Sequence, residues 1–507
     1  MWVWPTLATL VVGLAGIGHA QPWRDELATW SAATRPIGDL VRMAGTIDAA
    51  TGPYYLLMHG WVAVFGDSVT ALRLPSVLAM AVAAGLTALL GQWLLGTRAG
   101  LLAGLLFAVL PGTSRYAQEA RPYALATSLA VLATLLLVGA LRRPGWVRWA
   151  GYAAAVAALG LAHLIALTLL AAHAVAVLLV QWRGTAAAGL GPAPAADRRS
   201  TRSTDGPPAG NRPADTGVDS DRPGDDRRGP VPWPWLVALL PAVVLVTPLA
   251  QLARGQRSRQ LDWVDPARLT DLAALPGGVA QSGAVGGLLL GLAALGAARL
   301  GRRALLPGAC VLAPVLLVFA AGLVVPLWVP RYLIFTVPFG CLLAGAALAS
   351  VPLPPALAVV ALASLLGLPD QAALRRTHEW PRSATVDYAG AARIIGDGQR
   401  PGDAIVYSPR DSWLFLDLGT EYHLAQRRPR DVLAVRDERQ RADLWATECA
   451  RPTECLAGVR RVWLVVAGRH PDPVGAVPQP KADALRDGFS VERVWQRPGL
   501  TVALLSR

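Results

Sequence analysis

Long uncharged apolar runs constrain this chain more than any other feature of its sequence. They are roughly 18 to 25 residues long, enough for a helix to cross a hydrocarbon core of about 30 Å. In lipid every backbone polar group must be satisfied internally, so such a run has to be helical. Only 16% of the 507 residues are charged and 53% are hydrophobic, whereas a soluble domain carries about 25% charge. We therefore predict a polytopic α-helical membrane protein.

The apolar runs predict about eleven transmembrane helices. The first run has no basic segment before it and is followed directly by charged residues, so we expect a retained anchor and not a cleaved signal peptide. The expected spans lie at residues 2–20, 70–95, 99–114, 122–141, 149–162, 164–182, 233–252, 282–298, 304–328, 332–350 and 354–369.

The remaining segments divide the chain into four parts. Residues 183–232 are rich in Pro, Gly, Asp, Arg and Ser, a composition typical of disorder, and we expect a disordered cytoplasmic insert. The predicted parts are an N-terminal membrane module (1–182) with outer loops at 21–69 and 114–123, the insert (183–232), C-terminal membrane helices (233–369) and a soluble domain (370–507).

Arginine supplies nearly all of the net charge of +13, and it collects in short loops around Arg143, Arg183 and Arg302. By the positive-inside rule these loops are cytoplasmic, and an odd number of spans then places the C-terminal domain outside the cytoplasm. We expect a multi-pass protein of the plasma membrane. A nucleic-acid-binding surface would gather its charge on one soluble face, so we expect no nucleic-acid partner.

The C-terminal segment alternates helix-like and strand-like stretches. A helix is predicted near Asp387–Gly396, with strands at Ala404–Tyr407 and Val462–Val466, which together indicate a small α/β domain. Cys449 and Cys455 close a short loop there. They predict a disulfide, which requires an oxidising compartment; the alternative is two unrelated thiols.

Two outer loops place ionisable groups next to the membrane. Asp25 and Glu26 follow the first span directly. The second loop contains Arg115, Tyr116, Glu119, Arg121 and Tyr123. Charged groups this close to hydrocarbon usually pair or face a hydrated cavity, and they are functional candidates. The alternatives are simple solvation of the two acids and structural pairing of Glu119 with an arginine.

A third outer loop carries Arg254, Arg257 and Arg259, followed by Trp263. The arginines suit contact with a phosphate or a lipid headgroup, or are simply solvated, and Trp263 suits an anchor at headgroup level. His163 lies at a tight outer turn, where it either contacts a substrate or is a buried core histidine. The sequence has no His or Cys/His cluster with metal-ligand spacing, and no Gly-rich phosphate signature that would support a cytoplasmic nucleotide.

Five motifs in a fixed order resemble a known family. They are Asp25-Glu26, Gly52-Pro53-Tyr54-Tyr55, Arg73-Leu74-Pro75, the loop from Arg115 to Tyr123, and Pro330-Arg331-Tyr332-Leu333. Together they resemble the bacterial relatives of the protein O-mannosyltransferases, glycosyltransferase family 39 in the GT-C superfamily. The resemblance is strongest over about residues 20–180, recurs weakly at 330–350, and does not cover the insert or the C-terminal domain.

The resemblance implies an inverting transfer of a sugar, commonly mannose, from a polyprenyl-phosphate donor to an acceptor hydroxyl outside the cytoplasm. The attacking hydroxyl must lose a proton, and the family pattern makes Asp25 the general base. Glu26 would orient Asp25 or the acceptor, or assist a divalent cation if one binds. The phosphate leaving group would be held by arginines. Candidates for contact with donor or acceptor are Arg115, Tyr116, Glu119, Arg121, Tyr123, His163, Arg257, Arg331 and Tyr332.

Several alternatives stay open at this stage. The sugar could be arabinose or another pentose, and the acceptor a protein, a lipid or a polysaccharide. A transporter or flippase of lipid-linked glycans also needs a lipid-phosphate site, but its charges should lie near the bilayer midplane, whereas here they lie in outer loops. A third alternative is a scaffold whose C-terminal domain binds cell-wall polymer.

Overall fold

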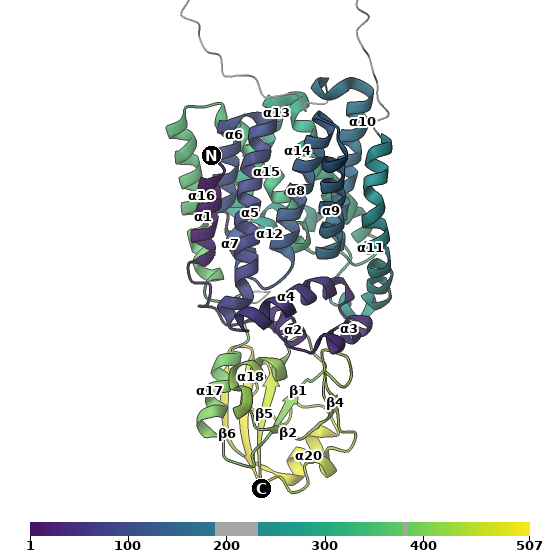
Figure 1. The fold of residues 1–507 in the computed structure, drawn as a ribbon. Helices are drawn as coiled ribbons and strands as arrows, with labels where there is room; N and C mark the ends of the chain where they lie inside the picture. Colours follow the sequence, from purple (N-terminus) through teal and green to yellow (C-terminus); the bar gives the residue numbers. More distant parts are fainter. Residues whose placement is uncertain (188–231, 379–383) are drawn as a thin grey trace, which may run out of the picture.

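The computed structural model describes residues 1–187, 232–378 and 384–507. Most of the predicted disordered insert, residues 183–232, lies outside the described residues. Figure 1 shows a helix bundle with an α/β domain attached to one end and a layer of short helices between them. This architecture confirms the predicted fold class, a polytopic α-helical membrane protein with a C-terminal α/β domain.

The bundle consists of long apolar helices and short 3₁₀ turns. Its helices are α1 (Val3–Leu14), α5 (Val69–Leu95), α6 (Thr97–Val109), α7 (Pro111–Ala117), α8 (Tyr123–Arg142), α9 (Trp146–Ala162), α10 (Leu169–Ala187), α11 (Pro232–Gln260), α12 (Leu269–Ala280), α13 (Gly283–Leu300), α14 (Leu305–Gly322), α15 (Val337–Ala349) and α16 (Leu353–Leu374). Its 3₁₀ turns are η2 (Leu164–Thr168), η3 (Gly301–Ala304) and η4 (Pro330–Thr336).

Within the described residues, seven helical stretches are long and apolar enough to cross a membrane, or eight if the α6–α7 pair, bent by 66°, is one span. This count is lower than the prediction of about eleven, although each expected run coincides with a helix. The difference comes from helix length: α1 has 12 residues and α9 has 17, below the 18 that the count requires. In addition, α13 and α14 form one 40-residue stretch in that count, although η3 separates them.

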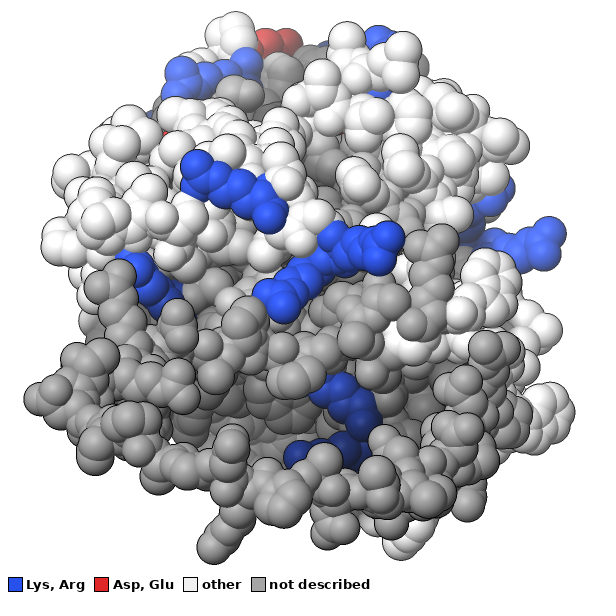
Figure 2. Space-filling model, turned by 90° about the horizontal axis from the view of Figure 1, so that it is seen from above, with Lys and Arg blue, Asp and Glu red and all other residues white. Residues whose placement is uncertain are grey.

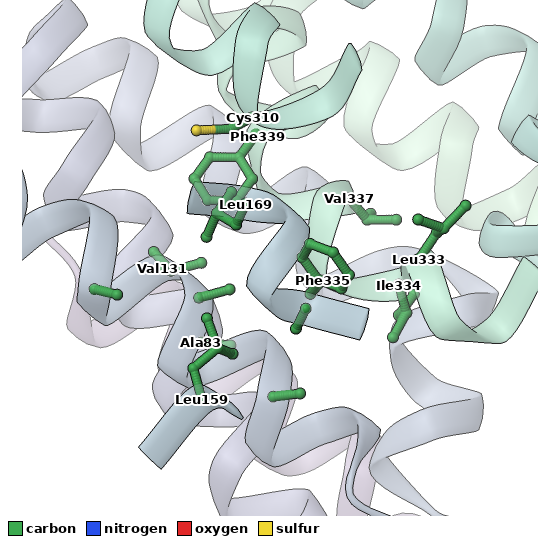
Figure 3. Close-up of a cluster of buried hydrophobic side chains, with 14 of the residues drawn as sticks. Ala83, Val131, Leu159, Leu169, Cys310, Leu333, Ile334, Phe335, Val337 and Phe339 are labelled. Carbon is green, nitrogen blue, oxygen red and sulfur yellow. The ribbon is translucent and has the colours of Figure 1, made fainter. Parts of the chain in front are cut away.

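Small and apolar side chains fill the core of the bundle. Figure 3 shows part of it, where Leu169, Phe335 and Phe339 pack among α8, α10 and α15. Two glycines permit an especially close approach of α5 and α6, because a Cβ on Gly91 would lie 2.6 Å from the Cα of Gly100. Such small-residue contacts are the main way in which helices associate in lipid.

The first outer segment folds into a helical layer against the end of the bundle. It consists of α2 (Arg24–Ala33), α3 (Ile37–Thr46), η1 (Ala49–Thr51) and α4 (Gly52–Phe65). Figure 1 shows this layer between the bundle and the α/β domain. Residues that follow the first span in sequence are therefore enclosed between two folded parts of the protein.

The C-terminal domain is built on a five-stranded mixed sheet in the order β2-β1-β5-β7-β6. Strand β1 pairs in parallel with β2 and β5, while β7 pairs antiparallel with β5 and β6. The predicted helix and both predicted strands are confirmed as α17, β1 and β5. The elements are α17 (Tyr388–Gly398), β1 (Ala404–Ser408), α18 (Leu416–Leu424), η6 (Ala425–Arg427), β2 (Arg430–Asp431), β3 (Ala434–Arg436), β4 (Thr447–Glu448), α19 (Pro452–Cys455), β5 (Arg461–Ala467), α20 (Lys481–Gly488), β6 (Ser490–Arg497) and β7 (Leu500–Ser506).

Two further features bear on the location of this domain. Cys449 and Cys455 are joined in a disulfide. At the opposite end of the molecule, the described part of the face turned away from the α/β domain shows several basic side chains and few acidic ones (Figure 2). Exposed arginines at the α8–α9 and α13–α14 connections are Arg143, Arg148 in the first turn of α9, Arg302 and Arg303. Arginines therefore gather at these two connections.

Candidate active site

A cavity of about 500 Å³ is enclosed by the bundle, the layer of short helices and the α/β domain. Its lining is dominated by apolar side chains, but it also contains five arginines and two aspartates. These charged residues are Arg24, Asp25, Asp48, Arg121, Arg254, Arg257 and Arg331. Because the arginines outnumber the acids, the cavity is suited to bind an anionic ligand.

Asp25 lies in the first turn of α2, where the sequence predicts the general base. Its side chain is 19% exposed, and its Oδ2 lies 3.6 Å from a terminal nitrogen of Arg331 in η4. The guanidinium of Arg331 also lies over the rings of Trp23 and Trp263, at 5.9 and 5.4 Å. These contacts hold a carboxylate and a guanidinium side by side in one cavity.

Glu26, which we expected to orient Asp25 or the acceptor or to assist a divalent cation, points away from the cavity. It is buried and accepts two hydrogen bonds from Arg73, at 2.7 Å to Oε1 and 2.6 Å to Oε2. Its carboxylate also accepts the backbone N–H groups of Ala120 at 3.0 Å and Trp23 at 3.3 Å. These four donors use its carboxylate oxygens, and Glu26 does not line the cavity. Of the expected roles, this geometry favours the orientation of Asp25 over contact with an acceptor or a metal. Glu26 fixes α2, and thereby Asp25, against α5.

Asp48 is a second cavity carboxylate that sequence reasoning missed. It has a left-handed backbone with φ of 55°, a conformation that aspartate tolerates better than most residues. Its oxygens accept hydrogen bonds from Thr51 at 2.8 Å, Gln260 at 3.0 Å and the Tyr55 hydroxyl, and Arg121 lies 4.0 Å away. Burial raises the pKa of Asp48, although Arg121 and the hydrogen bonds oppose that shift.

Arg121 connects this carboxylate to the second predicted loop. Its Nη1 donates to the Tyr55 hydroxyl at 3.1 Å, and the nearby tyrosines help to raise the pKa of Arg121 against the effect of burial. Arg121 is thus a permanent cation in the wall of the cavity. The signal that could have revealed Asp48 is a lone acid among apolar residues, just before the Gly52-Pro53-Tyr54-Tyr55 motif.

Three of the predicted loop residues lie next to the main cavity and not in it. Arg115, Tyr116 and Glu119 line a separate cavity of about 40 Å³, together with Arg331. Arg115 and Glu119 are 3.6 Å apart, so the predicted structural pairing of Glu119 is present. Burial raises the pKa of Glu119 to about 6, although Arg115 opposes the shift. These three residues were predicted to contact the donor or the acceptor, and the structure places them outside the main cavity.

The predicted aromatic residues form a cluster in the wall of the main cavity. The ring centroids of Tyr123 and Tyr332 are 6.2 Å apart, and the His163 ring lies 5.8 Å from Tyr123 and 5.5 Å from Tyr332. All three residues line the cavity. The Nδ1 atom of His163 is buried without a hydrogen-bond partner, which leaves it available to a ligand.

The arginines predicted in a third outer loop instead lie on a helix, because α11 continues to Gln260. Arg254 and Arg257 line the cavity. Arg259 points to the α/β domain, where its Nη2 lies 3.1 Å from Asp443. Helical spacing therefore separates the three arginines into two groups, one that faces the cavity and one that holds the two parts of the protein together.

Within the described residues, no group of three or more His, Cys, Asp or Glu side chains could hold a metal ion.

The residues from the α/β domain that line the cavity, Trp413 and Phe415, were not predicted as site residues. The sequence feature that could have drawn attention to them is the presence of two aromatic residues in a polar segment. That feature does not predict that they lie against the membrane part of the protein.

The fold and the cavity define a class of membrane protein in which a helix bundle and a layer of short outer helices enclose an acidic side chain among arginines. Residues 53–189 match the sequence model of the dolichyl-phosphate-mannose-protein mannosyltransferase family. A comparison with curated proteins gives no match.

Solved structures show a likeness in fold over the whole chain. ArnT from Cupriavidus metallidurans bound to undecaprenyl phosphate is 13% identical, with a TM-score of 0.63 over 99% of this chain and 97% of ArnT. Its apo state gives a TM-score of 0.62 at 13% identity over the same shares. The Archaeoglobus fulgidus oligosaccharyltransferase is 11% identical, with a TM-score of 0.47 over 99% of this chain and 74% of its own. The ArnT comparison confirms the GT-C fold that the sequence motifs predicted.

Proposed function

We propose that this protein transfers a sugar from a polyprenyl-phosphate donor to an acceptor hydroxyl at the outer face of the plasma membrane. The observation that carries the proposal is the Asp25–Arg331 pair in a cavity lined by four further arginines. The fold shared with ArnT, whose structure holds undecaprenyl phosphate, supports a lipid-phosphate ligand.

The acceptor hydroxyl donates its proton to Asp25 as its oxygen attacks the anomeric carbon of the donor sugar. The bond between that carbon and the phosphate oxygen breaks on the opposite side, so the configuration inverts. Asp25 suits this role because part of its carboxylate stays accessible in the cavity. Glu26, anchored by Arg73, positions the helix that carries Asp25.

The leaving phosphate gains negative charge in the transition state. Arg331, Arg121 and Arg257 line the same cavity as the base and can donate hydrogen bonds to the phosphate oxygens. Tyr123, Tyr332 and His163 form the adjacent wall. Since Arg115, Tyr116 and Glu119 lie outside the main cavity, we assign them no contact with the donor.

Mannose is our proposed donor sugar, supported by the family model that matches residues 53–189. Divalent cations prefer several carboxylate and carbonyl oxygens. The two cavity carboxylates do not fit such a site, because Asp48 accepts three hydrogen bonds and Asp25 is paired with Arg331. The mechanism therefore contains no step through a metal ion.

The α/β domain is proposed to lie outside the cytoplasm. Arginine-rich loops are retained on the cytoplasmic side, and the exposed arginines lie on the face of the bundle turned away from that domain (Figure 2). The disulfide between Cys449 and Cys455 agrees with an oxidising compartment. The same placement argues against a transporter, because the charged cavity lies at the end of the bundle that carries the domain.

Purified protein in lipid vesicles, supplied with radiolabelled polyprenyl-phosphate sugars and a cell-envelope extract, tests the proposal. We expect label from polyprenyl-phosphate mannose to enter the extract, and no transfer from a nucleotide sugar. Activity with polyprenyl-phosphate arabinose alone would support the proposed type of reaction but show that the donor sugar is arabinose and not mannose. If labelled lipid crosses the bilayer without being consumed, the transporter alternative is correct.

A further inference from the structure

The α/β domain supplies one wall of the active-site cavity. Trp413 and Phe415, in the loop between β1 and α18, line the cavity together with residues of the membrane part. Trp413 is half-buried, whereas Phe415 is 1% exposed. The accessible surface of this wall is therefore mainly the Trp413 ring, with Phe415 behind it.

This aromatic wall is held in a fixed arrangement. Trp413 packs edge to face on Trp445 at 4.8 Å and on Phe415 at 5.7 Å. Phe415 in turn stacks on Trp445 with an interplanar angle of 19°. Phe415 has a φ of 48°, which is rare for a bulky residue, and strained residues of this kind cluster at ligand sites.

The wall is also attached to the helices that carry the site. Arg259 of α11 pairs with Asp443 at 3.1 Å and lies 5.9 Å from the Trp445 ring centroid. On the other side, Trp30 of α2 packs edge to face on Tyr422 at 5.3 Å. Since α2 also carries Asp25, the α/β domain that supplies the wall contacts both α11 and the helix of the proposed base.

Backbone groups on both sides of Trp413 are already hydrogen-bonded within the domain. The Ser412 carbonyl accepts hydrogen bonds from Trp445 Nε1 at 3.0 Å and from the Phe415 N–H at 3.1 Å. The Leu414 N–H donates to Ser412 Oγ at 3.2 Å, and its carbonyl accepts the Tyr388 hydroxyl. Strand addition, one of the recurring ways to bind an extended peptide, needs unpaired backbone groups. This wall presents aromatic side chains instead.

Aromatic faces suit the C–H faces of a sugar ring, because their π-electrons carry partial negative charge. Gln260, which lines the same cavity, can hydrogen-bond to the hydroxyl groups around such a ring. The donor is tied to the membrane by its lipid, which leaves the side of the α/β domain to the acceptor. We propose that the acceptor is a carbohydrate, one sugar ring of which stacks on Trp413. This inference rests on the proposed function and names its acceptor class.

Two variants of the full-length protein in vesicles test the inference, Trp413→Ala and Trp413→Phe. The matched control is Trp146→Ala, at the start of α9, because this side chain is 82% exposed and does not line the cavity. Labelled polyprenyl-phosphate mannose is supplied with either a delipidated envelope polysaccharide or an envelope protein fraction. Release of free mannose to water measures donor use without an acceptor. Equilibrium dialysis of the polysaccharide against each variant, without donor, measures binding alone.

We expect protease-resistant label in the polysaccharide. Trp413→Ala should raise the acceptor KM and weaken polysaccharide binding by about fivefold, with donor KM and mannose release unchanged, while Trp413→Phe restores most of the binding. Label in protease-sensitive protein, or wild-type KM and binding for Trp413→Ala, would overturn the inference. If the wild type consumes no donor, the proposed function fails, and the dialysis still decides whether Trp413 binds carbohydrate.

Discussion

Replacing each of the adjacent acids Asp25 and Glu26 by its amide should have a different main effect. Asp25→Asn should mainly reduce sugar transfer, whereas Glu26→Gln should mainly reduce the stability of the protein. Glu26→Gln keeps the shape of the side chain but removes its charge, which leaves Arg73 buried without a counter-charge, since both side chains are at most 2% exposed. Breaking a buried ion pair from one side costs about 3–5 kcal/mol. Thermal unfolding of the purified variant should therefore begin several degrees below the wild type, while transfer per folded molecule stays within about tenfold, the effect of ~1.4 kcal/mol on a positioned group.

A double variant makes this prediction specific. In Glu26→Gln with Arg73→Met, the unpaired charge is absent, so the combined loss of stability should be smaller than the sum of the two single losses. Unfolding midpoints of the four proteins in one detergent provide the measurement. The reasoning is refuted if Glu26→Gln unfolds like the wild type and loses transfer as fully as Asp25→Asn, because Glu26 would then act in the chemistry.

Three further predictions follow from the site and the domain. Arg331→Met should lower transfer by about 10²–10³-fold, the usual effect of removing one transition-state donor, and an unchanged rate in vesicle assays would exclude its role. Because burial raises the pKa of Glu119 from 4.5 to about 6, the native state binds more protons in that window, and stability should fall as pH rises through it. Unfolding midpoints of Glu119→Gln should lack this slope. Replacing Cys449 and Cys455 by serine should destabilise the α/β domain by ~2 kcal/mol, measured by unfolding with and without reductant.

The membrane architecture could be predicted from the sequence because a backbone in lipid must satisfy its own hydrogen bonds, and a long apolar run does so as a helix. Each apolar run coincides with a helix, and the alternating pattern of the C-terminal segment gave α17, β1 and β5. Helix lengths were less accessible. α9 ends at Ala162 without a Gly or Pro to mark its end, whereas the end of α6 before Leu110 precedes Pro111, and a proline disfavours the helical conformation at the residue before it. The short apolar helix α12 was not predicted, because its 12 residues cannot span a bilayer.

Site residues could be predicted where charged side chains directly follow or precede an apolar run, because such charges are functional candidates. Asp25, Arg121 and Arg331 meet in one cavity, although Arg331 is far from the others in sequence. The buried pairing of Glu26 with Arg73 was not accessible, because it depends on which face of α2 meets α5. The contribution of Trp413 also depends on how the α/β domain docks, which no local pattern encodes.

The most direct test of the central claim is sugar transfer by wild type and Asp25→Asn in the same vesicles, with polyprenyl-phosphate mannose and an envelope extract. Binding of the lipid donor to each protein is measured in parallel, and unfolding midpoints control for folding. The account predicts a loss of transfer of at least about a hundredfold, the low end for removal of a general base, with donor binding retained. Transfer by Asp25→Asn within a fewfold of the wild type would contradict it.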